Sequence, residues 1–392
     1  MSEPLLKTGV IGSSAKENEW RLPLHPDHLP LLDDSVRARL WVEEGYAVRY
    51  GITDNHLRGL VAGVASREEL LATSDLVIIP KPVREDLMCV RKGGVVFGWL
   101  HCVQQPQLTQ VAVDRQLTLI TWESMNSWHP DGEWDMHIFY RNNEIAGYAG
   151  VAHALSVMGR TGWYGRPLKS AGVIGSGSVA RGAIIALQNR GVREIVMFGL
   201  TPAHLVPHML QGVEYRELQP NADGCVSALR ADGTRAPLLA HLADADIVVN
   251  GLLQDPDRPL VYMDEADSTR LRDGALIIDI SCDAGMGFTF ARPTTFDSPT
   301  FRVGGVTYYA VDHTPSYMWD SSTWEVSRAV MPYLTTVMRG PTGWEQDSTV
   351  SRAVEVREGR IINPSILSFQ RRDPLYPHAV ATIGPRAETH RG

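Results

Sequence analysis

The chain has 392 residues, enough for about two domains of ordinary size. Hydrophobic residues make up 44% and charged residues 21%, which is typical of a globular protein and excludes a largely disordered chain. The 37 basic and 45 acidic residues give a net charge of −8, which argues against a general binder of nucleic acid or anionic membranes.

No apolar run is long enough to span a bilayer, and residues 1–20 lack the pattern of a signal peptide. The four cysteines (Cys89, Cys102, Cys225 and Cys282) contain no CxxC spacing, which favours reduced thiols over a disulfide framework or a zinc site. These features predict a cytoplasmic protein.

Short apolar runs rich in valine and isoleucine recur without alternation, which is typical of buried strands in parallel sheets covered on both faces. The runs span residues 6–12, 74–80, 93–100, 117–123, 170–175, 194–199, 245–251 and 274–280. Helix-like stretches lie between several of them. The pattern predicts an α/β fold with two doubly wound Rossmann-like domains, running from about Lys7 to Glu123 and from about Ser170 to Asp279.

Two further helices would connect these domains. Residues 144–159 are rich in small residues and compatible with a helix, and Ser322–Glu325 fits a capping box before an apolar run. The chain would then divide into a substrate and catalytic domain (residues 1–143 and 321–392) and a dinucleotide-binding domain (residues 144–320). A cleft between the two domains would hold the ligands.

A glycine-rich turn at residues 175–180 gives the strongest local signal. It reads Gly175-Ser176-Gly177-Ser178-Val179-Ala180, matches GxGxxA, and lies between a predicted strand and a predicted helix. Gly175 would form the tight turn, Gly177 would let the backbone approach a pyrophosphate, and Ala180 would permit close helix–strand packing.

The acid that completes a NAD fingerprint is missing, because the next strand ends at Phe198-Gly199 with no Asp or Glu. No arginine stands nearby for a 2′-phosphate, although Thr201 and His204 are within reach of one. This favours NADP(H), with NAD(H) as the alternative. Asn250 and Gly251, at the end of another predicted strand, are additional cofactor-binding candidates.

Four polar residues stand at loop edges: Arg21, Lys81, His101 and Asp283. The last three directly follow predicted strands, where open α/β sheets place their ligands. Any one of them alone is more often a solvated or packed side chain.

Together these residues and their order resemble the superfamily of alanine dehydrogenase and the transhydrogenase NAD domain. The matching motifs are KENEWR at 16–21, PKP at 80–82, LH at 100–101, GSGSVA at 175–180, IDISCDAG at 278–285 and ARPTTFDSPTF at 291–301. Within it, residues 140–155, 175–183 and the HTPS of 313–316 look more like N5-(carboxyethyl)ornithine synthase. The resemblance covers the chain to about residue 345 and departs at 124–139.

The resemblance implies that Arg21 and Lys81 hold the carboxylate and oxo group of a 2-oxo acid. It also implies that His101 is the general acid/base and that Asp283 lies beside the reacting carbon. The residue types fit this chemistry, because a planar Arg suits a carboxylate and a nearby donor stabilises the charge of hydride transfer. Asp279 is a weaker candidate that is equally compatible with a structural role.

Three functions remain open from the sequence. The first is reduction, by NAD(P)H, of an imine between a 2-oxo acid and an amino-acid amine, giving an opine-like product. The second is an amino-acid dehydrogenase that uses ammonia, and the third is a non-enzymatic nucleotide-binding or transhydrogenase-like subunit. A homo-oligomer with small-molecule substrates is expected in the enzymatic cases.

The aromatic segment 122–140 predicts ordinary packing, with a shaped pocket or an interdomain contact as the alternative. Its alternating His129, Asp131, Glu133, Asp135 and His137 would share one face of a strand and offer metal ligands. Since Asp131-Gly132 is a turn signal, the sequence favours an acidic hairpin tip without a metal.

Overall fold

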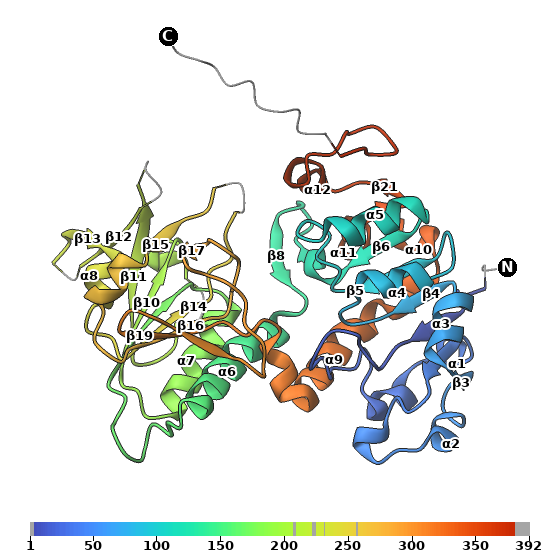
Figure 1. The fold of residues 1–392 in the computed structure, drawn as a ribbon. Coiled ribbons are helices and arrows are strands. Elements are labelled where there is room, and N and C mark those ends of the chain that lie inside the picture. The colour runs from blue at the N-terminus through green and yellow to red at the C-terminus, as the bar shows by residue number, and fades with distance from the viewer. Residues whose placement is uncertain (1–3, 207–208, 222–224, 231, 256–257, 381–392) are drawn as a thin grey trace, which may run out of the picture. The chain divides into compact units, whose positions relative to one another are not determined.

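The computed structural model describes residues 4–206, 209–221, 225–230, 232–255 and 258–380. They form two compact units, unit 1 within residues 1–139 and 323–392 and unit 2 within residues 140–322 (Figure 1). Each unit is built around its own mainly parallel sheet, so the predicted α/β fold with two Rossmann-like domains is confirmed. The sequence analysis placed the domain boundaries at 143/144 and 320/321, and the units meet at 139/140 and 322/323. The substrate-binding and cofactor-binding roles assigned to the two domains stay predictions.

The sheet of unit 1 has the strand order β21-β20-β6-β5-β4-β1-β2-β3, and all neighbours from β6 to β3 are parallel. The part β3-β2-β1-β4-β5-β6 has the strand order of a Rossmann fold. The strands are β1 Thr8–Val10, β2 Leu40–Glu43, β3 Gly63–Ala65, β4 Leu76–Ile78, β5 Val95–Gly98, β6 Thr118–Thr121, β20 Val354–Arg357 and β21 Arg360–Ile361. A separate hairpin pairs β7 Asn126–Trp128 with β8 Trp134–His137.

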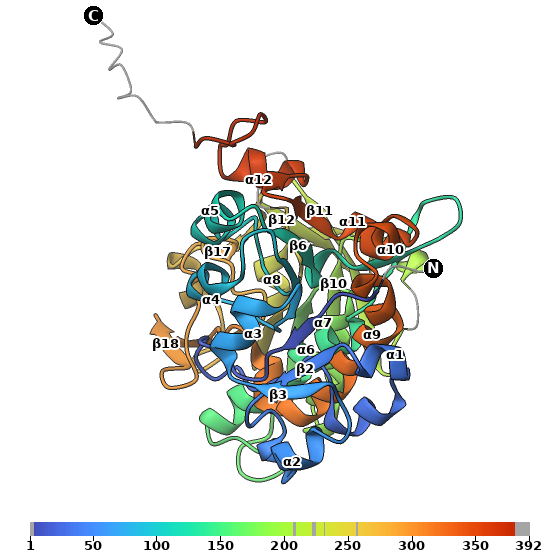
Figure 2. The same cartoon turned by 90° about the vertical axis from the view of Figure 1, so that its right-hand side faces the viewer.

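Helices cover both faces of this sheet. On one face, α3, α4 and α5 lie side by side (Figures 1 and 2), and Val77 of β4 packs in their apolar cluster. On the other face, Val326 and Val330 of α9 pack with Ile78, the next residue of β4. Both faces of the strand are therefore buried, which explains its unbroken apolar sequence. The helices are α1 Asp34–Arg37, α2 Asp54–Leu57, α3 Arg67–Thr73, α4 Arg84–Cys89, α5 Pro106–Asp114, α9 Trp319–Met338, α10 Pro341–Glu345, α11 Ser348–Arg352 and α12 Pro364–Phe369, with 3₁₀ turns η1 Pro26–Leu31, η2 Val48–Tyr50 and η3 Trp122–Ser124.

The sheet of unit 2 has the order β13-β12-β11-β10-β9-β14-β16-β19-β18, parallel from β11 to β19. Its strands are β9 Ser170–Ile174, β10 Glu194–Gly199, β11 Val213–Pro220, β12 Val226–Leu229, β13 Arg235–Pro237, β14 Ile247–Asn250, β16 Leu276–Asp279, β18 Thr300–Val303 and β19 Val306–Tyr309, beside a small pair of β15 Val261–Met263 and β17 Gly287–Phe288. The helices are α6 Tyr140–Val157, α7 Ser178–Asn189 and α8 Leu238–Leu242, with 3₁₀ turns η4 Ala203–Leu205, η5 Ala266–Arg270 and η6 Thr314–Met318. Helices α6 and α7 pack on one face of the sheet, and α8 packs on the other.

Two predicted boundaries are wrong. The second α/β unit does not end at Asp279, because β18 and β19 extend the sheet to Tyr309. The capping box at Ser322–Glu325 does not form, because η6 runs directly into α9 and the helix already begins at Trp319. Inside that helix the Ser322 hydroxyl donates to the Pro315 carbonyl (2.8 Å).

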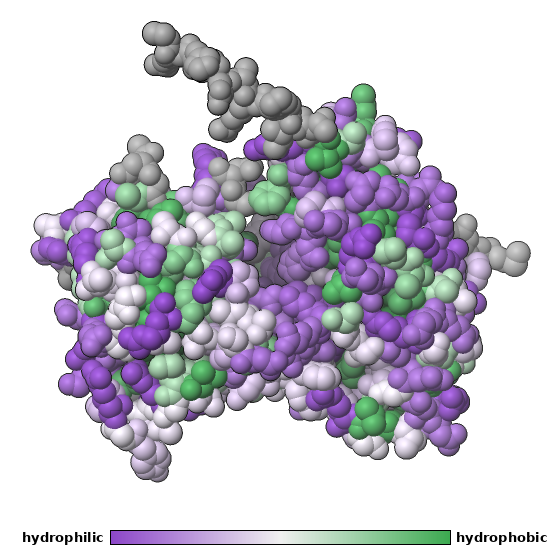
Figure 3. All heavy atoms as spheres, viewed as in Figure 1, coloured by the Kyte–Doolittle hydropathy of each residue, from purple (hydrophilic) through white to green (hydrophobic). Residues whose placement is uncertain are grey.

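The described residues form no helix that is long and apolar enough to cross a membrane. On the face seen in Figure 3, polar residues predominate over both units, and apolar residues form small scattered groups. Scattered apolar residues of this kind are normal on a protein surface.

Candidate active site

The strand order of unit 1 reverses between β1 and β4, because the chain leaves β1 toward β2 and leaves β4 toward β5. Open α/β sheets bind ligands at the carboxyl ends of the strands that flank such a switch point. The loop 11–21 follows β1 here, and Lys81 follows β4. The Ser14 hydroxyl donates to the Lys81 carbonyl (3.1 Å), so the two loops lie together.

Arg21 is buried, with 4% of its surface exposed. Its Nε donates to Glu19 Oε1 (2.8 Å) and its Nη2 to Glu19 Oε2 (2.5 Å), a bidentate pair. The guanidinium also lies over the Trp99 ring, 4.5 Å from its centroid. A buried arginine held in one plane is preorganised for a second carboxylate, but Glu19 already compensates its charge.

Glu43, the last residue of β2, holds the loop after β1. Its carboxylate accepts hydrogen bonds from the backbone N–H of Gly12 and of Ser13 (2.7 Å each) and from the Ser13 hydroxyl (2.5 Å). The sequence analysis missed this residue, although an acid at the end of a strand next to β1 was a usable signal.

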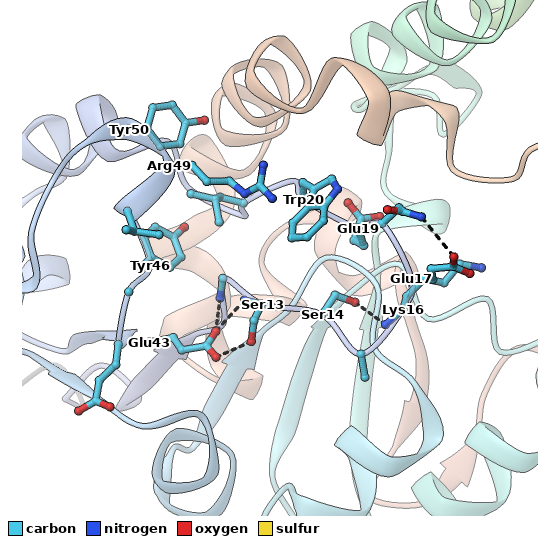
Figure 4. A pocket seen from close by; sticks show the side chains of 17 residues that line it. Ser13, Ser14, Lys16, Glu17, Glu19, Trp20, Glu43, Tyr46, Arg49 and Tyr50 are labelled. Carbon is cyan, nitrogen blue, oxygen red and sulfur yellow. Dashed lines mark hydrogen bonds between the residues drawn. The ribbon is translucent and has the colours of Figure 1, made fainter. Parts of the chain in front are cut away.

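Beside this loop lies a cavity of about 320 Å³. Loop residues 12–20 line one side and residues 43–50, which follow β2, line the other (Figure 4). The Arg49 guanidinium lies over the Trp20 ring at 3.7 Å from its centroid, and Lys16, Glu17 and Tyr50 also line the cavity. The cavity therefore has aromatic, cationic and acidic lining beside the loop that carries Arg21, because Glu17, Glu19, Glu43 and Glu44 line it as well.

His101 follows β5, the strand beyond β4, and takes a left-handed backbone conformation with φ of 46°. The Glu123 carboxylate accepts the backbone N–H of Leu100 (3.3 Å) and of His101. Such a conformation costs energy for a residue other than glycine, and these hydrogen bonds offset that cost. Glu123 therefore positions the histidine, a role that the sequence analysis did not assign to it.

Glu123, which is partly exposed, lies close to a buried acid, Glu355 of β20. Burial, followed by the charge of Glu355, raises the pKa of Glu123 to about 8. Glu355 accepts hydrogen bonds from the Ser124 hydroxyl (2.6 Å) and from Asn363 Nδ2 (3.1 Å). Glu123, which holds the turn of His101, thus has a second carboxyl group close by. No motif predicted this pair, because Glu355 is 232 positions from Glu123.

The segment 122–140 has both buried and exposed aromatic residues. Trp122 and Phe139 are buried and stack on each other, and both contact the Trp99 ring at steep angles, so the predicted ordinary packing is confirmed for this part. The β7–β8 hairpin confirms the predicted turn at Asp131-Gly132. Within the described ranges, no three His, Cys, Asp or Glu side chains gather as metal ligands.

In unit 2 the strand order reverses between β9 and β14. Gly175 follows β9 with φ of 118°, a conformation that favours glycine. A Cβ there would lie 2.9 Å from the carbonyl oxygen of Gly251, the residue that follows β14. The predicted cofactor loop and the Asn250-Gly251 segment are therefore neighbours at this switch point.

Gly177 precedes α7, and its φ of −87° is open to any residue. A Cβ on Gly177 would meet no described atom within 4 Å, so packing does not require glycine here. The first residues of α7, Ser178 and Val179, direct their backbone N–H groups toward the same end of the helix. Open space at a helix N-terminus fits the pyrophosphate of a dinucleotide.

Close helix packing depends on Gly182, which the fingerprint did not include. A Cβ there would lie 1.7 Å from the Glu144 carbonyl oxygen of α6, and one at Gly147 would lie 1.8 Å from the Val179 carbonyl oxygen. Ala180 is fully buried in the apolar cluster of this unit. Helices α6 and α7 can approach this closely because both positions lack a side chain.

Asn250 and Asp279 form a buried polar cluster. Asn250 Nδ2 donates to Asp279 Oδ1 (2.9 Å), which also accepts the Cys282 N–H (3.0 Å), and the Tyr308 hydroxyl donates to Asp279 Oδ2. Burial raises the pKa of Asp279 to about 6. This saturation supports a structural role for both side chains. Asp283 lies on the following loop, and burial also raises its pKa.

The structure thus groups the predicted residues into two sets. Arg21, Lys81 and His101 follow the neighbouring strands β1, β4 and β5 of unit 1. The glycine loop, Thr201, Asn250, Gly251 and Asp283 lie at or after the carboxyl ends of strands of unit 2. That the two sets act on one substrate stays a prediction.

Comparisons with known proteins match both units. The family description "Alanine dehydrogenase/PNT, N-terminal domain" matches residues 11–145, and "Alanine dehydrogenase/PNT, C-terminal domain" matches residues 170–364. An N(5)-(carboxyethyl)ornithine synthase of Clostridium botulinum is 26% identical over 328 residues, covering 80% of this chain and 89% of that protein. An alanine dehydrogenase of Mycobacterium tuberculosis is 23% identical over 366 residues, covering 91% and 95%.

Solved structures show the same fold. An L-alanine dehydrogenase superimposes with a TM-score of 0.73 at 20% identity, covering 92% of this chain and 98% of that one. A transhydrogenase from Sinorhizobium meliloti gives 0.68 at 17% identity, covering 91% and 99%.

Proposed function

Because the chain belongs to the alanine dehydrogenase/PNT family, we propose that it is a nicotinamide-dependent oxidoreductase that joins a 2-oxo acid to the amine of an amino acid. The amine attacks the carbonyl carbon, water leaves, and the resulting imine is reduced to a secondary amine. The family supports an oxidoreductase acting on amino acids, and the carboxyethylornithine synthases among its relatives support the condensation.

The cavity beside loop 12–20 is the observation that favours an amino acid, rather than ammonia, as the amine substrate. Ammonia needs a small closed site, whereas a second amino acid needs room and an anchor for its carboxylate. The volume of about 320 Å³ falls within the range of small-molecule pockets, roughly 300–1,000 Å³. Arg49 and Lys16 supply positive charge in it, while two of its acids, Glu43 and Glu19, are engaged by backbone N–H groups and by Arg21. Ser14 connects the lining to the Lys81 loop.

Each residue of unit 1 then has a defined task. Arg21, held in plane by Glu19, binds the carboxylate of the 2-oxo acid, and Lys81 donates to its oxo group. His101 takes a proton from the attacking amine nitrogen and returns to its neutral form by giving a proton to the departing oxygen as water leaves.

Asp283 of unit 2 accepts a hydrogen bond from the substrate nitrogen and stabilises the iminium charge. Burial raises its pKa, so the carboxyl group is a better proton acceptor than one in open water.

The glycine loop of unit 2 fits the phosphates of a dinucleotide, because a side chain at Gly177 would fill the space above α7. The bound nicotinamide supplies the hydride. NADP(H) and NAD(H) are both candidates, since β10 ends in Gly199 with no charged side chain of its own.

The test is the oxidation of NADH and NADPH by the full-length protein with pyruvate and either ammonia or a panel of amino acids. Turnover that requires an amino acid is the expected result and identifies the amine. Turnover with ammonia alone would instead establish an alanine dehydrogenase-like activity, the second candidate, which the relatives of that name favour. Cofactor binding without turnover on any pair would favour a non-enzymatic or transhydrogenase-like subunit.

An Arg49→Gln variant tests the amine cavity directly. It should raise KM for the amino acid about tenfold and leave KM for pyruvate unchanged, because only the second substrate lies against Arg49. Arg58→Gln is the matched control, since Arg58 is also exposed on unit 1 and lies outside the cavity. An equal rise for both substrates, or none, would remove the cavity from the mechanism.

A further inference from the structure

The carboxyl end of β10 has no room for the acid that a NAD site normally places there. Gly199 ends this strand, and a Cβ on it would lie 2.5 Å from the Tyr215 hydroxyl oxygen and 2.8 Å from Ser176 Oγ. Any side chain at this position must displace both groups. The missing acid is therefore a consequence of packing, and its absence does not by itself indicate a 2′-phosphate.

Tyr215 reaches this point from β11, the parallel neighbour of β10. Its hydroxyl donates to the Thr201 carbonyl and hydrogen-bonds with Ser176 of the glycine loop. The tyrosine thus ties the exit of β10 to the loop that would hold the pyrophosphate. Its side chain stands where the ribose of a dinucleotide meets a Rossmann sheet.

Glu217 stands on the same face, two residues further along β11. It is in register with Gly199, and in-register residues of parallel strands point to the same side of a sheet. Neighbouring strands are about 4.8 Å apart, a distance that a glutamate side chain can span. The Glu217 carboxylate is near enough to the Tyr215 hydroxyl to contribute, after burial, to its raised pKa.

The other charges of β11 do not favour a 2′-phosphate. Arg216 points to the opposite face of the strand, where Nε donates to Glu214 (2.7 Å) and Nη1 contacts His241 (2.6 Å). Glu217 forms no ion pair within the described ranges of the chain, so its negative charge is not compensated there.

We propose that Glu217, supplied by β11, binds the adenosine ribose hydroxyls in place of the acid missing from β10 and selects NAD(H) against NADP(H). The inference rests on the proposed dinucleotide site. A carboxylate accepts hydrogen bonds from the 2′-hydroxyl and repels a 2′-phosphate. This reverses the preference for NADP(H) expected from the sequence.

The test compares dissociation constants of NADH and NADPH, followed by nicotinamide fluorescence, for the full-length protein and three variants. The unmodified chain should bind NADH about tenfold or more tightly than NADPH. Glu217→Gln keeps the shape of the side chain and should reduce this ratio about tenfold. Glu217→Arg should invert the preference and gives a second reading if the amide variant folds poorly. Glu214→Gln, on the same strand and the opposite face, should leave the ratio unchanged.

Tighter binding of NADPH by the unmodified chain would overturn the inference. So would an unchanged ratio in both Glu217 variants, or an equal change in Glu214→Gln. In these cases binding persists and the proposed function stands. If neither dinucleotide binds, the proposed function fails as well.

Discussion

Gly177 has room for a side chain and Gly182 has none, so substitutions at the two positions distinguish a glycine required for ligand binding from one required for packing. A Cβ at this position meets nothing within 4 Å, and φ of −87° with ψ of −168° is extended backbone that valine readily adopts. Gly177→Val should therefore cost only the weaker N-cap preference of valine, about 1 kcal/mol. For a unit of this size that lowers Tm by roughly 2–4 °C.

The same change should weaken dinucleotide binding at least about 100-fold, close to 2.7 kcal/mol, because the side chain occupies the approach of the pyrophosphate to α7. Thermal unfolding and a fluorescence titration with NADH measure the two effects separately. Gly182→Ala is the control in which stability should change. Its Cβ would lie 1.7 Å from the Glu144 carbonyl oxygen, so the free energy of unfolding should fall by several kcal/mol. Unchanged NADH affinity in Gly177→Val would refute the position of the site, and a large loss of stability would refute the argument from open space.

Two further predictions concern the turn that carries His101. His101→Asn should lower turnover about 100-fold or more and leave NADH affinity within about twofold, as measured by steady-state kinetics and titration, whereas the exposed His129→Asn should change neither. Glu123→Gln should flatten the dependence of stability on pH. Since the pKa of Glu123 is raised from 4.5 to about 8 in the folded chain, its contribution is fully present below pH 4.5 and is lost as pH rises through about 8, by up to about 1.4 kcal/mol per pH unit. Urea unfolding at pH 6 and pH 9 measures this difference, and an equal decline in both proteins would show that another group is responsible.

Local patterns predicted the strands well because a buried parallel strand is apolar on both faces. Val77 and Ile78 contact opposite helical layers, so neither position tolerates a polar residue. The glycine loop was recognisable for a similar reason, since its spacing, strand and helix are contiguous in the chain. The hairpin at Asp131-Gly132 likewise depends on adjacent residues.

The features that escaped prediction depend on residues far apart in sequence. Gly182 needs the carbonyl of Glu144, and the exclusion of a side chain at Gly199 needs Tyr215 from the next strand. The start of α9 was misplaced because η6 continues into it, which removes the need for the cap expected at Ser322. Each case required the register or packing of a second element.

Acidic side chains organise the loops that carry the proposed chemistry of unit 1. Glu43 fixes the backbone after β1, Glu19 fixes the Arg21 guanidinium, and Glu123 fixes the turn of His101. A carboxylate suits this task because it accepts several N–H donors at once. The cost is negative charge at Glu43 and Glu19, near a site proposed to bind carboxylates, whereas the raised pKa of Glu123 keeps that group largely uncharged near neutral pH. The cations Arg21, Lys81, Lys16 and Arg49 are therefore needed to make that site attractive to its substrates. The charge balance of these loops, more than any single motif, should determine which amino acid the site accepts.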